Sequence, residues 1–574
     1  MKRGLGLSEN TFAKQDNCHI LKRESDNYRL QPACGGSMKD IDTSTFNFEK
    51  LVSNGFLYVD KTAYVHKLAR PAFAEYFLSR PRRFGKSLLV STLKALFQGR
   101  RELFKGLDID KMDYDWKPYP VIHLDFGNAG GDSVGELNDQ LTSMLEDAAD
   151  ENTISLRGKG VAIQFKNLVN DLAKRAKREL LAKDPAKKGD DAQVVVLVDE
   201  YDKPILGNID NPNVSSILKL LKGFYSVIKT NEKFIRFAFI TGVSKFAHVS
   251  LFSDLNNLTD ITLKTDYAGM LGFSEAEIRR YFADRIPLAA AANSLADEEL
   301  MARLLKWYDG YRFSKAETHV CNPVSVSKFF FNDYDFANYW DSTGMPSFLL
   351  KVAQDQDYDY EAALTRFYDE SVFSAYELDR LDITGLLWQT GYLTIKEVRR
   401  EEEGLQYRLD FPDKEVQTTF TEKVIEFLVG IKQGDEASSL ARQLRTAIRK
   451  DDLTGFMTLF QSFLACISYD MHLPHEKYYQ TIFFVVFKLL GASVEAESRT
   501  NEGRIDAYIR TQKNVYIFEF KLNKTSRKAI GQIIDRRYYE KFQSSGLPIK
   551  MVGVNFNSKK GRLDNWAETA LADT

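Results

Sequence analysis

Short apolar runs alternate with longer segments of helical spacing in the first half of the chain. The stretches "AEYFLSR" (74–80), "YPVIHLDF" (119–126), "VVVLVDEYDKP" (194–204) and "FIRFAFITGVSKF" (234–246) predict strands, and "GFLYVDKTAYVHKLA" (55–69) predicts a short strand followed by a helix. The five aliphatic residues that open 194–204 are typical of a strand buried on both faces. Strands that alternate with helices in this way indicate an α/β fold with a mainly parallel sheet.

The pattern turns helical near residue 272 and becomes mixed again near residue 470. In "GFSEAEIRRYF", Ser274 and Glu277 have the spacing of a capping box. Residues 474–542 read as helix, strand, strand, strand and helix, and 549–556 adds a further strand. We therefore predict a disordered extension at 1–37, an α/β domain at 38–290, a helical lid or linker region at 291–465 and a second α/β domain at 466–574.

The first candidate for chemistry lies between the strand at 74–80 and a helix over 87–97. Residues 80–87, "RPRRFGKS", match the second half of the phosphate-loop pattern G-x-x-x-x-G-K-[ST] with Gly85, Lys86 and Ser87. Arg80 stands where the pattern has its opening glycine, a position where a tight turn often requires positive φ. Gly85 would let the backbone approach a phosphate, Lys86 would offer it a charge, and Ser87 would open a helix and ligate Mg²⁺. A basic loop followed by a helix is the competing interpretation of the half-motif alone.

Two later strands supply the other half of such a site. Asp199 and Glu200 end the buried aliphatic strand, at the carboxyl edge where ligands of parallel sheets bind. There, Asp199 can hold the Mg²⁺ shell and Glu200 can act as general base toward the attacking water. Thr241 ends a strand that we expect beside the Asp199 strand, so its hydroxyl could sense a γ-phosphate. Solvated acids after a core strand and an ordinary strand-ending threonine are the simpler alternatives.

The C-terminal strands carry a third polar set. In "VYIFEFKL", Glu519 and Lys521 share one face and the two phenylalanines share the other. Charges on an apolar strand are costly unless they pair or bind a metal. Asp506, in "GRIDAYI", lies on a strand that can form a hairpin with this one, so two carboxylates and a lysine would converge as a Mg²⁺ site. A structural Glu–Lys pair on a sheet edge is the alternative.

Composition limits the possible partners, metal sites and cellular location of the protein. The 574 residues carry a formal net charge of −2, so contact with nucleic acid would need local basic patches rather than a global positive field. The four cysteines are scattered without a CxxC spacing, which argues against zinc and disulfide scaffolds and favours a reducing, cytoplasmic location. No apolar run reaches the roughly 18 residues of a membrane span, so we expect no membrane partner.

The ordered series of motifs resembles the bacterial AAA-ATPase-like family of P-loop ATPases, many of which are fused to a C-terminal nuclease-like domain. The segments that carry the resemblance are "LYVDKT", "RPRRFGKS", "VVVLVDEYDKPI", "ITGVSKF", "SLFSDLNNLTDITL", "WYDGYRF", "CNPVSV" and "FANYWDSTGMPSFL". In that family RPRRFGK(S/T) is itself the signature, so Arg80 departs from the general pattern but not from the family's. The resemblance implies ATP binding by Arg83, Gly85, Lys86, Ser87, Asp199 and Thr241, with Ser87 and Asp199 as Mg²⁺ ligands. Tyr311 and Arg312 of "WYDGYRF" could read the nucleotide state, although a plain helix end is the simpler interpretation.

The C-terminal set resembles the PD-(D/E)xK nuclease superfamily, which implies a restriction-endonuclease-like α/β fold. By position, Asp506 and Glu519 would hold Mg²⁺, and Lys521 would act on the attacking water and stabilise the charge of the transition state. Glu476 and Gln532 match additional site positions of that superfamily. Nearby basic residues with interleaved tyrosines suit a phosphate backbone and stacked bases, or else form a solvated helix face. They are Lys524, Arg527, Lys528, Arg536, Arg537, Tyr538 and Tyr539.

The sequence thus predicts a multidomain α/β enzyme with a P-loop NTPase core, a helical middle region and a C-terminal nuclease domain. ATP and Mg²⁺ are the expected cofactors, and DNA or RNA is the expected partner. The nucleotide state would gate a Mg²⁺-dependent nuclease. The rival interpretation is an ATP-dependent switch whose nuclease-like domain is inactive and binds nucleic acid or protein. Association with a second copy of the chain or with another protein is compatible with both.

Overall fold

The computed structural model describes most of the chain from residue 38 onward. The described residues are 38–185, 192–209, 211–245, 251–252, 257–340, 358, 360–374, 382–429, 439–440, 443–444, 446–448, 450–466, 479, 482–483, 493–500, 503–511 and 513–571. The predicted extension at 1–37 lies outside them.

The first domain is built on a parallel sheet. Its described strands are β1 (Ala74–Ser79), β2 (Val121–Asp125), β3 (Val194–Asp199), β4 (Ile235–Gly242) and β5 (Thr259–Asp260), in the order β2-β3-β4-β1-β5. Successive residues of β3 face two different apolar cores, Val195 and Leu197 one of them and Val196 and Val198 the other. The predicted parallel sheet, and a β3 buried on both faces, are therefore confirmed.

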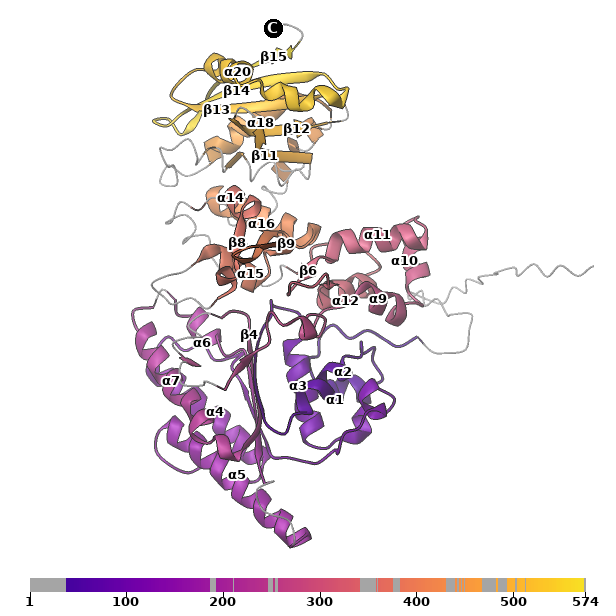
Figure 1. Cartoon of the computed structure of the whole chain (residues 1–574), viewed down its shortest axis with the longest axis vertical. Helices are drawn as coiled ribbons and strands as arrows, with labels where there is room; N and C mark the ends of the chain where they lie inside the picture. Colours follow the sequence, from indigo (N-terminus) through magenta and orange to yellow (C-terminus); the bar gives the residue numbers. More distant parts are fainter. Residues whose placement is uncertain are drawn as a thin grey trace, which may run out of the picture.

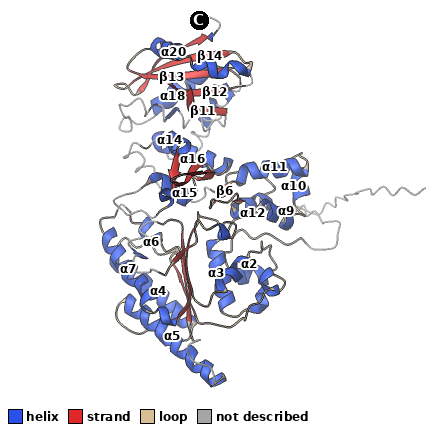
Figure 2. Ribbon diagram, in the orientation of Figure 1, coloured by secondary structure: helices blue, strands red, loops and turns tan. Residues whose placement is uncertain are grey.

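Helices cover both faces of this sheet (Figures 1 and 2). On one side lie α1 (Phe48–Ser53), α2 (Thr62–Ala69) and α3 (Lys86–Phe97), and on the other α4 (Val134–Glu151), α5 (Val161–Lys183) and α7 (Val214–Thr230). Short helices add η1 (Arg101–Phe104), η2 (Asp108–Lys111), α6 (Lys203–Leu206), η4 (Glu232–Phe234) and η5 (Thr265–Tyr267).

The strand predicted just before α2 does not form. Residues 56–61 carry no strand, because their backbone and side chains bond to loops instead of to a sheet. The Leu57 amide donates to the Asp40 carbonyl at 2.8 Å, and the Asp60 carboxylate accepts from the Asp108 amide at 2.7 Å. An apolar run alone therefore predicted a strand that has no neighbouring strand to pair with.

The middle region contains strands as well as the helices that were predicted to dominate it. It begins with α9 (Glu275–Tyr281), α10 (Ile286–Ala292), α11 (Asp297–Tyr308) and α12 (Pro323–Phe331), with a small hairpin of β6 (Tyr311–Arg312) and β7 (His319–Val320). The capping box at α9 is confirmed, since the Ser274 hydroxyl accepts from the Glu277 amide and the Glu277 carboxylate accepts from the Ser274 amide. A three-stranded antiparallel sheet follows, which the helical periodicity of its neighbours had concealed.

That sheet has the order β8-β10-β9 and is surrounded by helices. Its elements are α14 (Tyr360–Thr365), β8 (Phe367–Asp369), η6 (Glu370–Phe373), α15 (Ile383–Thr390), β9 (Thr394–Glu401), β10 (Gly404–Asp410), α16 (Lys414–Val429) and α18 (Leu453–Cys466). α18 already packs on the C-terminal sheet, and the Tyr516 hydroxyl donates to Asp451 at 2.9 Å. Residues just before position 466 therefore contact the C-terminal sheet.

The C-terminal domain is a mixed sheet on which α20 packs. Its described elements are β11 (Ser493–Thr500), β12 (Gly503–Arg510), β13 (Val515–Leu522), α20 (Ser526–Asp535), η8 (Tyr538–Ser545), β14 (Ile549–Asn557) and β15 (Arg562–Ala570). Only β13 and β14 pair in parallel, across α20, and the other neighbours in the order β11-β12-β13-β14-β15 are antiparallel. The strand–strand–strand–helix–strand order matches the prediction, and β15 is an additional strand.

The parallel-sheet domain and the C-terminal sheet lie at opposite ends of the molecule, with the middle region between them (Figure 1). Within the residues that the structure describes, no helix has the length and apolar character needed to cross a membrane.

Candidate functional site

The phosphate-loop candidate connects β1 to α3. Gly85 precedes the helix with φ +86°, and α3 begins with Lys86 and Ser87, so backbone amides of the first turn point toward the loop. The other positive φ of the loop, +66°, occurs at Arg83, whereas Arg80 is not among the residues with positive φ. The expectation that the opening position needs glycine is therefore wrong for this loop, because its left-handed turn lies at Arg83 instead.

Arg80 ties the loop to the rest of the protein. Its side chain is buried, and its guanidinium donates to the carbonyls of Ser79 at 2.9 Å and Thr262 at 2.8 Å and lies 4.2 Å from the ring centre of Phe313. Burial lowers the pKa of Arg80 to about 9, and the nearby charge of Asp260 opposes that shift. A glycine could make none of these contacts, which gives a structural reason for arginine at this position.

Lys86 closes the loop on itself. Its ammonium donates to the carbonyls of Arg80 at 2.9 Å and Pro81 at 2.8 Å, and the side chain is buried. Burial lowers the pKa of Lys86, while nearby carboxylates, Asp199 first among them, oppose the shift. These bonds hold the Lys86 amine within the loop, which is where a phosphate-binding lysine must lie.

The two halves of the predicted nucleotide site meet in space. The Ser87 side chain lies next to the carboxylate of Asp199, which is only 2% exposed at the end of β3. Burial raises the pKa of Asp199 to about 6, and the neighbouring Ser87 hydroxyl and Lys86 charge oppose that shift. A hydroxyl beside a carboxylate is a donor set that suits Mg²⁺, so these two residues fit the predicted ion.

Glu200 follows Asp199 in a strained conformation. Its φ is +51°, a left-handed value that is uncommon outside glycine, and its amide donates to the Asp199 carboxylate at 2.9 Å. Its side chain is half-exposed at the carboxyl edge of the sheet. β2 also ends at this edge, with Asp125 in register with Asp199. Such strain is found where the surrounding structure must hold a side chain in one orientation.

Thr241 does not lie where a γ-phosphate sensor would. β4 does run beside β3, as predicted. However, the Thr241 side chain is fully buried, and its hydroxyl donates to the Leu78 carbonyl of β1 at 2.8 Å. This contact joins two strands, so the simpler alternative of a structural threonine describes the residue.

Asp202 is a further residue of this site that the motif analysis missed. Its buried carboxylate accepts from the amide and the hydroxyl of Ser244, both at 2.7 Å, and so fixes the end of β4 against the turn that carries Glu200. The sequence signal was present as the third acid of "DEYDK", but nothing in its spacing distinguished a buried anchor from a solvated acid.

The middle region packs directly on the phosphate loop. The Phe84 ring lies 4.7 Å from that of Tyr311 and 5.3 Å from that of Phe313. Gly391 also approaches the loop: its φ is +92°, and a Cβ there would lie 2.6 Å from the Cβ of Pro81, so only glycine permits this approach.

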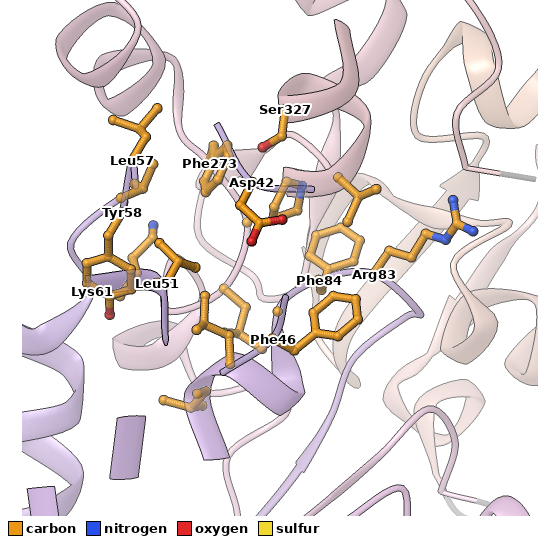
Figure 3. Close-up of a pocket in the computed structure, with 18 of the residues that line it drawn as sticks. Asp42, Phe46, Leu51, Leu57, Tyr58, Lys61, Arg83, Phe84, Phe273 and Ser327 are labelled. Carbon is orange, nitrogen blue, oxygen red and sulfur yellow. The ribbon is translucent and has the colours of Figure 1, made fainter. Parts of the chain in front are cut away.

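Two polar contacts extend this interface. The Arg83 guanidinium donates to the Tyr339 carbonyl, and the Lys245 amide donates to the Gln389 side chain at 2.8 Å. Arg83, predicted to bind the cofactor, thus reaches toward the middle region, and its side chain points away from the pocket in Figure 3. Arg312 bonds to Glu317 and to carbonyls of its own hairpin, so within "WYDGYRF" Tyr311, not Arg312, touches the loop.

A largely apolar pocket adjoins the same loop (Figure 3). Several parts of the chain line it: the segment from Ile41 to Val65, the start of α3 with Gly85, Phe273 just before α9, and residues of α12 such as Ser327. Phe46 lines it while remaining 53% exposed. The pocket therefore offers an apolar space next to the loop that is predicted to hold phosphates.

At the other end of the molecule, the predicted C-terminal residues also converge. Phe518 and Phe520 of β13 face one core, whereas Ile517 faces the other, which confirms the predicted alternation. The Lys521 ammonium donates to the Glu519 carboxylate at 2.7 Å, and their side chains are 10% and 1% exposed. The charged pair is therefore buried on the face that α20 covers.

Asp506 lies against the same pair. The ladder between β12 and β13 ends at Ala507 and Phe518, and two residues further along β13 the amide of Phe520 donates to the Asp506 carboxylate at 2.8 Å. The Asp506 side chain thus takes an acceptor position beside the strand that carries Glu519. Two carboxylates with several acceptor positions each fit a hard cation such as Mg²⁺.

An open polar hollow begins at this pair. Lys521 lines it together with residues just before α20, in α20 and in the turn that follows, namely Lys524, Lys528, Gly531, Gln532, Asp535, Arg536 and Tyr538. Gln532 is therefore brought beside Lys521, as predicted. Tyr538 is buried in the core, where its ring cannot stack on a base. Arg537 pairs with Glu540 at 3.6 Å. The basic residues of the hollow are therefore better placed to bind a phosphate than Tyr538 is to stack on a base.

Glu476 lies outside the described residues. Among those described, no group of three or more His, Cys, Asp or Glu side chains is arranged to hold a metal. The C-terminal site rests on Asp506, Glu519 and Lys521.

Comparison with known proteins agrees with both sites. Residues 43–252 match a family described as "Predicted AAA-ATPase", and residues 474–566 match the PD-(D/E)XK nuclease superfamily. A protein of Azotobacter chroococcum mcd 1, described as "Uncharacterized protein in vnfD 5'region", is 34% identical over 535 residues, which cover 91% of this chain and 97% of that protein. The chain belongs to the AAA-ATPase-like family with a C-terminal PD-(D/E)XK nuclease superfamily domain.

The two matches leave residues 253–473 between them. In this AAA-ATPase-like protein, that interval holds the elements that contact the phosphate loop through Tyr311, Phe313 and Gly391. The relative spans the interval as well, since the similarity covers nearly all of both chains. The exact domain limits at 38, 290 and 465 stay predictions.

Proposed function

We propose that this protein binds ATP and that its nucleotide state controls a Mg²⁺-dependent nuclease acting on DNA or RNA. The observation that supports it best is that Ser87 of the phosphate loop lies beside Asp199 of a distant strand, while Lys521, Glu519 and Asp506 gather at the other end. Each local motif is thereby completed by a residue from another strand.

In the nucleotide site, the amides at the start of α3 and the Lys86 ammonium would bind the phosphates. The apolar pocket beside Gly85 would take the base. Ser87 and Asp199 would hold Mg²⁺, which supplies positive charge to the phosphate oxygens. Glu200, held by its turn at the edge of the sheet, would orient and deprotonate the attacking water. Arg83 and Thr241 are left out of this scheme because their contacts lie elsewhere.

In the C-terminal site, Asp506 and Glu519 would hold Mg²⁺, whose charge would polarise the scissile phosphate. Lys521 would lower the pKa of the attacking water and stabilise the negative charge that develops in the transition state. Gln532 and the lysines of the hollow would position the phosphate backbone next to Lys521.

Control by nucleotide would pass through the phosphate loop. Pro81, Arg83 and Phe84 each contact the middle region, which lies between the two sites. A phosphate that binds Lys86 competes with the Arg80 and Pro81 carbonyls for its ammonium, so binding changes the segment on which the middle region packs. Such a change can shift the middle region only as far as the two loop states differ in their contacts with it.

A second candidate function has its own observation. The Lys521 ammonium pairs with Glu519 at 2.7 Å, and the described residues contain no group of three or more His, Cys, Asp or Glu side chains arranged to hold a metal. The protein would then be an ATP-dependent switch whose C-terminal domain binds nucleic acid or protein without cleaving it.

Incubation of the purified protein with Mg²⁺ and a mixture of labelled DNA and RNA separates the two. The nuclease predicts cleavage that disappears with EDTA and in Asp506→Asn, a variant of nearly equal shape. Absence of cleavage in the wild type, with ATP binding intact and nucleic acid retained in a binding assay, would select the switch. The cytoplasmic location and any association with further copies or proteins stay predictions.

A further inference from the structure

The C-terminal part of α5 extends beyond the core of the first domain. The buried residues of this helix end at Ala173, and the following residues to Lys183 are half-buried or exposed throughout. Figure 1 shows this end of α5 projecting from the edge of the domain, far from the C-terminal sheet. We call residues 174–183 the basic arm.

The charge of the basic arm is strongly one-sided. Its sequence, "KRAKRELLAK", has five cations and one anion, and that anion, Glu179, pairs with Arg175 at 3.4 Å. No ion pair is formed within the described chain by Lys174, Lys177 or Lys183, and the Arg178 guanidinium donates only to a carbonyl of the helix, that of Lys174. Lys174, Lys177 and Arg178 are spaced at i, i+3 and i+4, so like charges lie on one face of the helix and destabilise it.

Neighbouring elements do not neutralise this face. α4 carries six acids, the last of which is Glu151. The Arg175 guanidinium contacts the carbonyl of Asn152, the residue just after α4, so the rest of the arm extends beyond the end of α4 and its acids. η4 also contacts α5; it carries the exposed Lys233, and its one acid, Glu232, accepts a hydrogen bond from Asn257.

We propose that the basic arm binds the phosphate backbone of a nucleic acid, at a site separate from both the nucleotide site and the Asp506–Lys521 site. Uncompensated cations spaced along a projecting helix match a polyanion with regularly spaced charges. An anionic membrane surface fits less well, because such helices bury a broad apolar face, and the arm has no aromatic residue and only half-buried Leu180 and Leu181. The choice of nucleic acid over an acidic protein rests on the proposed function of the C-terminal domain.

Salt dependence of binding tests the arm directly. The probe is a fluorescent DNA duplex, titrated with the full-length protein in EDTA over a range of salt concentrations. Substitution of Lys174→Gln, Lys177→Gln and Arg178→Gln together should weaken binding and reduce the slope of log affinity against log salt by about 2.7, since each lost phosphate contact contributes about 0.9. Glutamine is a good helix former, so the arm should stay helical.

A matched control has the same charge change elsewhere in the domain. Lys50, Lys105 and Lys264 are exposed, and none forms an ion pair with another described residue. Their triple change to glutamine should leave the slope at its wild-type value. Equal slopes for the arm variant and the control variant would overturn the proposal.

A third variant separates this proposal from the nuclease. Lys524→Gln with Lys528→Gln removes two cations of the hollow beside Lys521. If this variant loses binding and the arm variant does not, the proposed function stands and the arm proposal falls. If only the arm variant loses binding, the arm stands and the hollow does not contact nucleic acid. If the arm variant keeps duplex binding but loses binding to phosphatidylserine vesicles, the arm is a membrane contact and the proposal is wrong.

Discussion

The nucleotide site and the C-terminal site are assembled in opposite ways. The nucleotide site collects Lys86, Ser87, Asp199 and Asp202 from segments far apart in the chain, and the middle region packs against its loop. The C-terminal site takes Asp506, Glu519 and Lys521 from two strands of one small sheet. The first therefore depends on the arrangement of the whole domain and can respond to its neighbours, whereas the second can keep its geometry on its own.

The largest expected effects are at the C-terminal site. Asp506→Ala should lower the cleavage rate by at least about 10²–10³-fold, as losing one electrostatic partner of the transition state typically does. It should also weaken Mg²⁺ binding, measured by calorimetry, because Asp506 is a proposed ligand. A variant that cleaves at the wild-type rate would remove Asp506 from the mechanism.

Lys521→Ala distinguishes a catalytic lysine from a structural one. Glu519 is 1% exposed, so loss of its partner should destabilise the fold by about 3–5 kcal/mol in the absence of metal. If the site binds Mg²⁺, the ion can replace the missing cation, and it should raise the melting temperature of this variant more than that of the wild type. A melting temperature that does not respond to Mg²⁺ would identify the pair as structural and favour the switch.

In the nucleotide site, Lys86→Ala should abolish ATP binding in a calorimetric titration. Because Lys86 donates to two loop carbonyls, the variant should also lose roughly 1–3 kcal/mol of stability. Lys94→Ala is the control on the same helix, since Lys94 pairs with Glu151 at 2.8 Å on the surface. Similar ATP affinities for the two variants would argue against the phosphate loop.

A smaller effect concerns the pH dependence of the same site. Because burial raises the pKa of Asp199 from 3.8 to about 6, the folded protein holds this proton more tightly than the unfolded chain. Its contribution to stability is therefore full below about pH 4 and is lost as the pH rises through about 6. Metal binding has the opposite sign, since it requires the ionised form, so affinity for Mg²⁺–ATP should fall roughly tenfold per pH unit below about 6.

Asp199→Asn supplies the reference for that titration. The variant should bind Mg²⁺–ATP weakly, and it should lack the part of the pH dependence that belongs to the carboxylate. The titration of ATP itself is common to both proteins and cancels in the comparison. Parallel pH profiles would show that Asp199 does not carry the effect.

The contrast between the sites also explains which features the sequence could predict. Alternation along β13 was enough to place Glu519 and Lys521 on one face, because strand geometry is local. The buried aliphatic run of β3 was enough to place Asp199 at the edge of a parallel sheet. The order of the strands, by contrast, decides that the Thr241 hydroxyl faces Leu78 and that Arg83 reaches Tyr339.

Other features depend on packing that no local pattern encodes. The general phosphate-loop pattern has glycine where this chain has Arg80. The role of Arg80 depends on its contacts with Phe313 and Thr262, which lie more than 180 positions further along the chain. The antiparallel sheet of β8, β9 and β10 lay among segments of helical spacing, and its pairing partners could not be read from their sequences. Asp202 looked like a solvated acid until Ser244 was placed beside it.

The central claim is that the nucleotide state reaches the C-terminal site through the phosphate loop. Its most direct test is the single-turnover cleavage rate of a labelled substrate with and without ATP, in the wild type and in Phe84→Leu, after equal ATP affinity has been verified for both. The account predicts a rate ratio that differs from one in the wild type and moves toward one in Phe84→Leu, because this change weakens the contacts with Tyr311 and Phe313. A wild-type ratio of one, or the same ratio in both proteins, would contradict it.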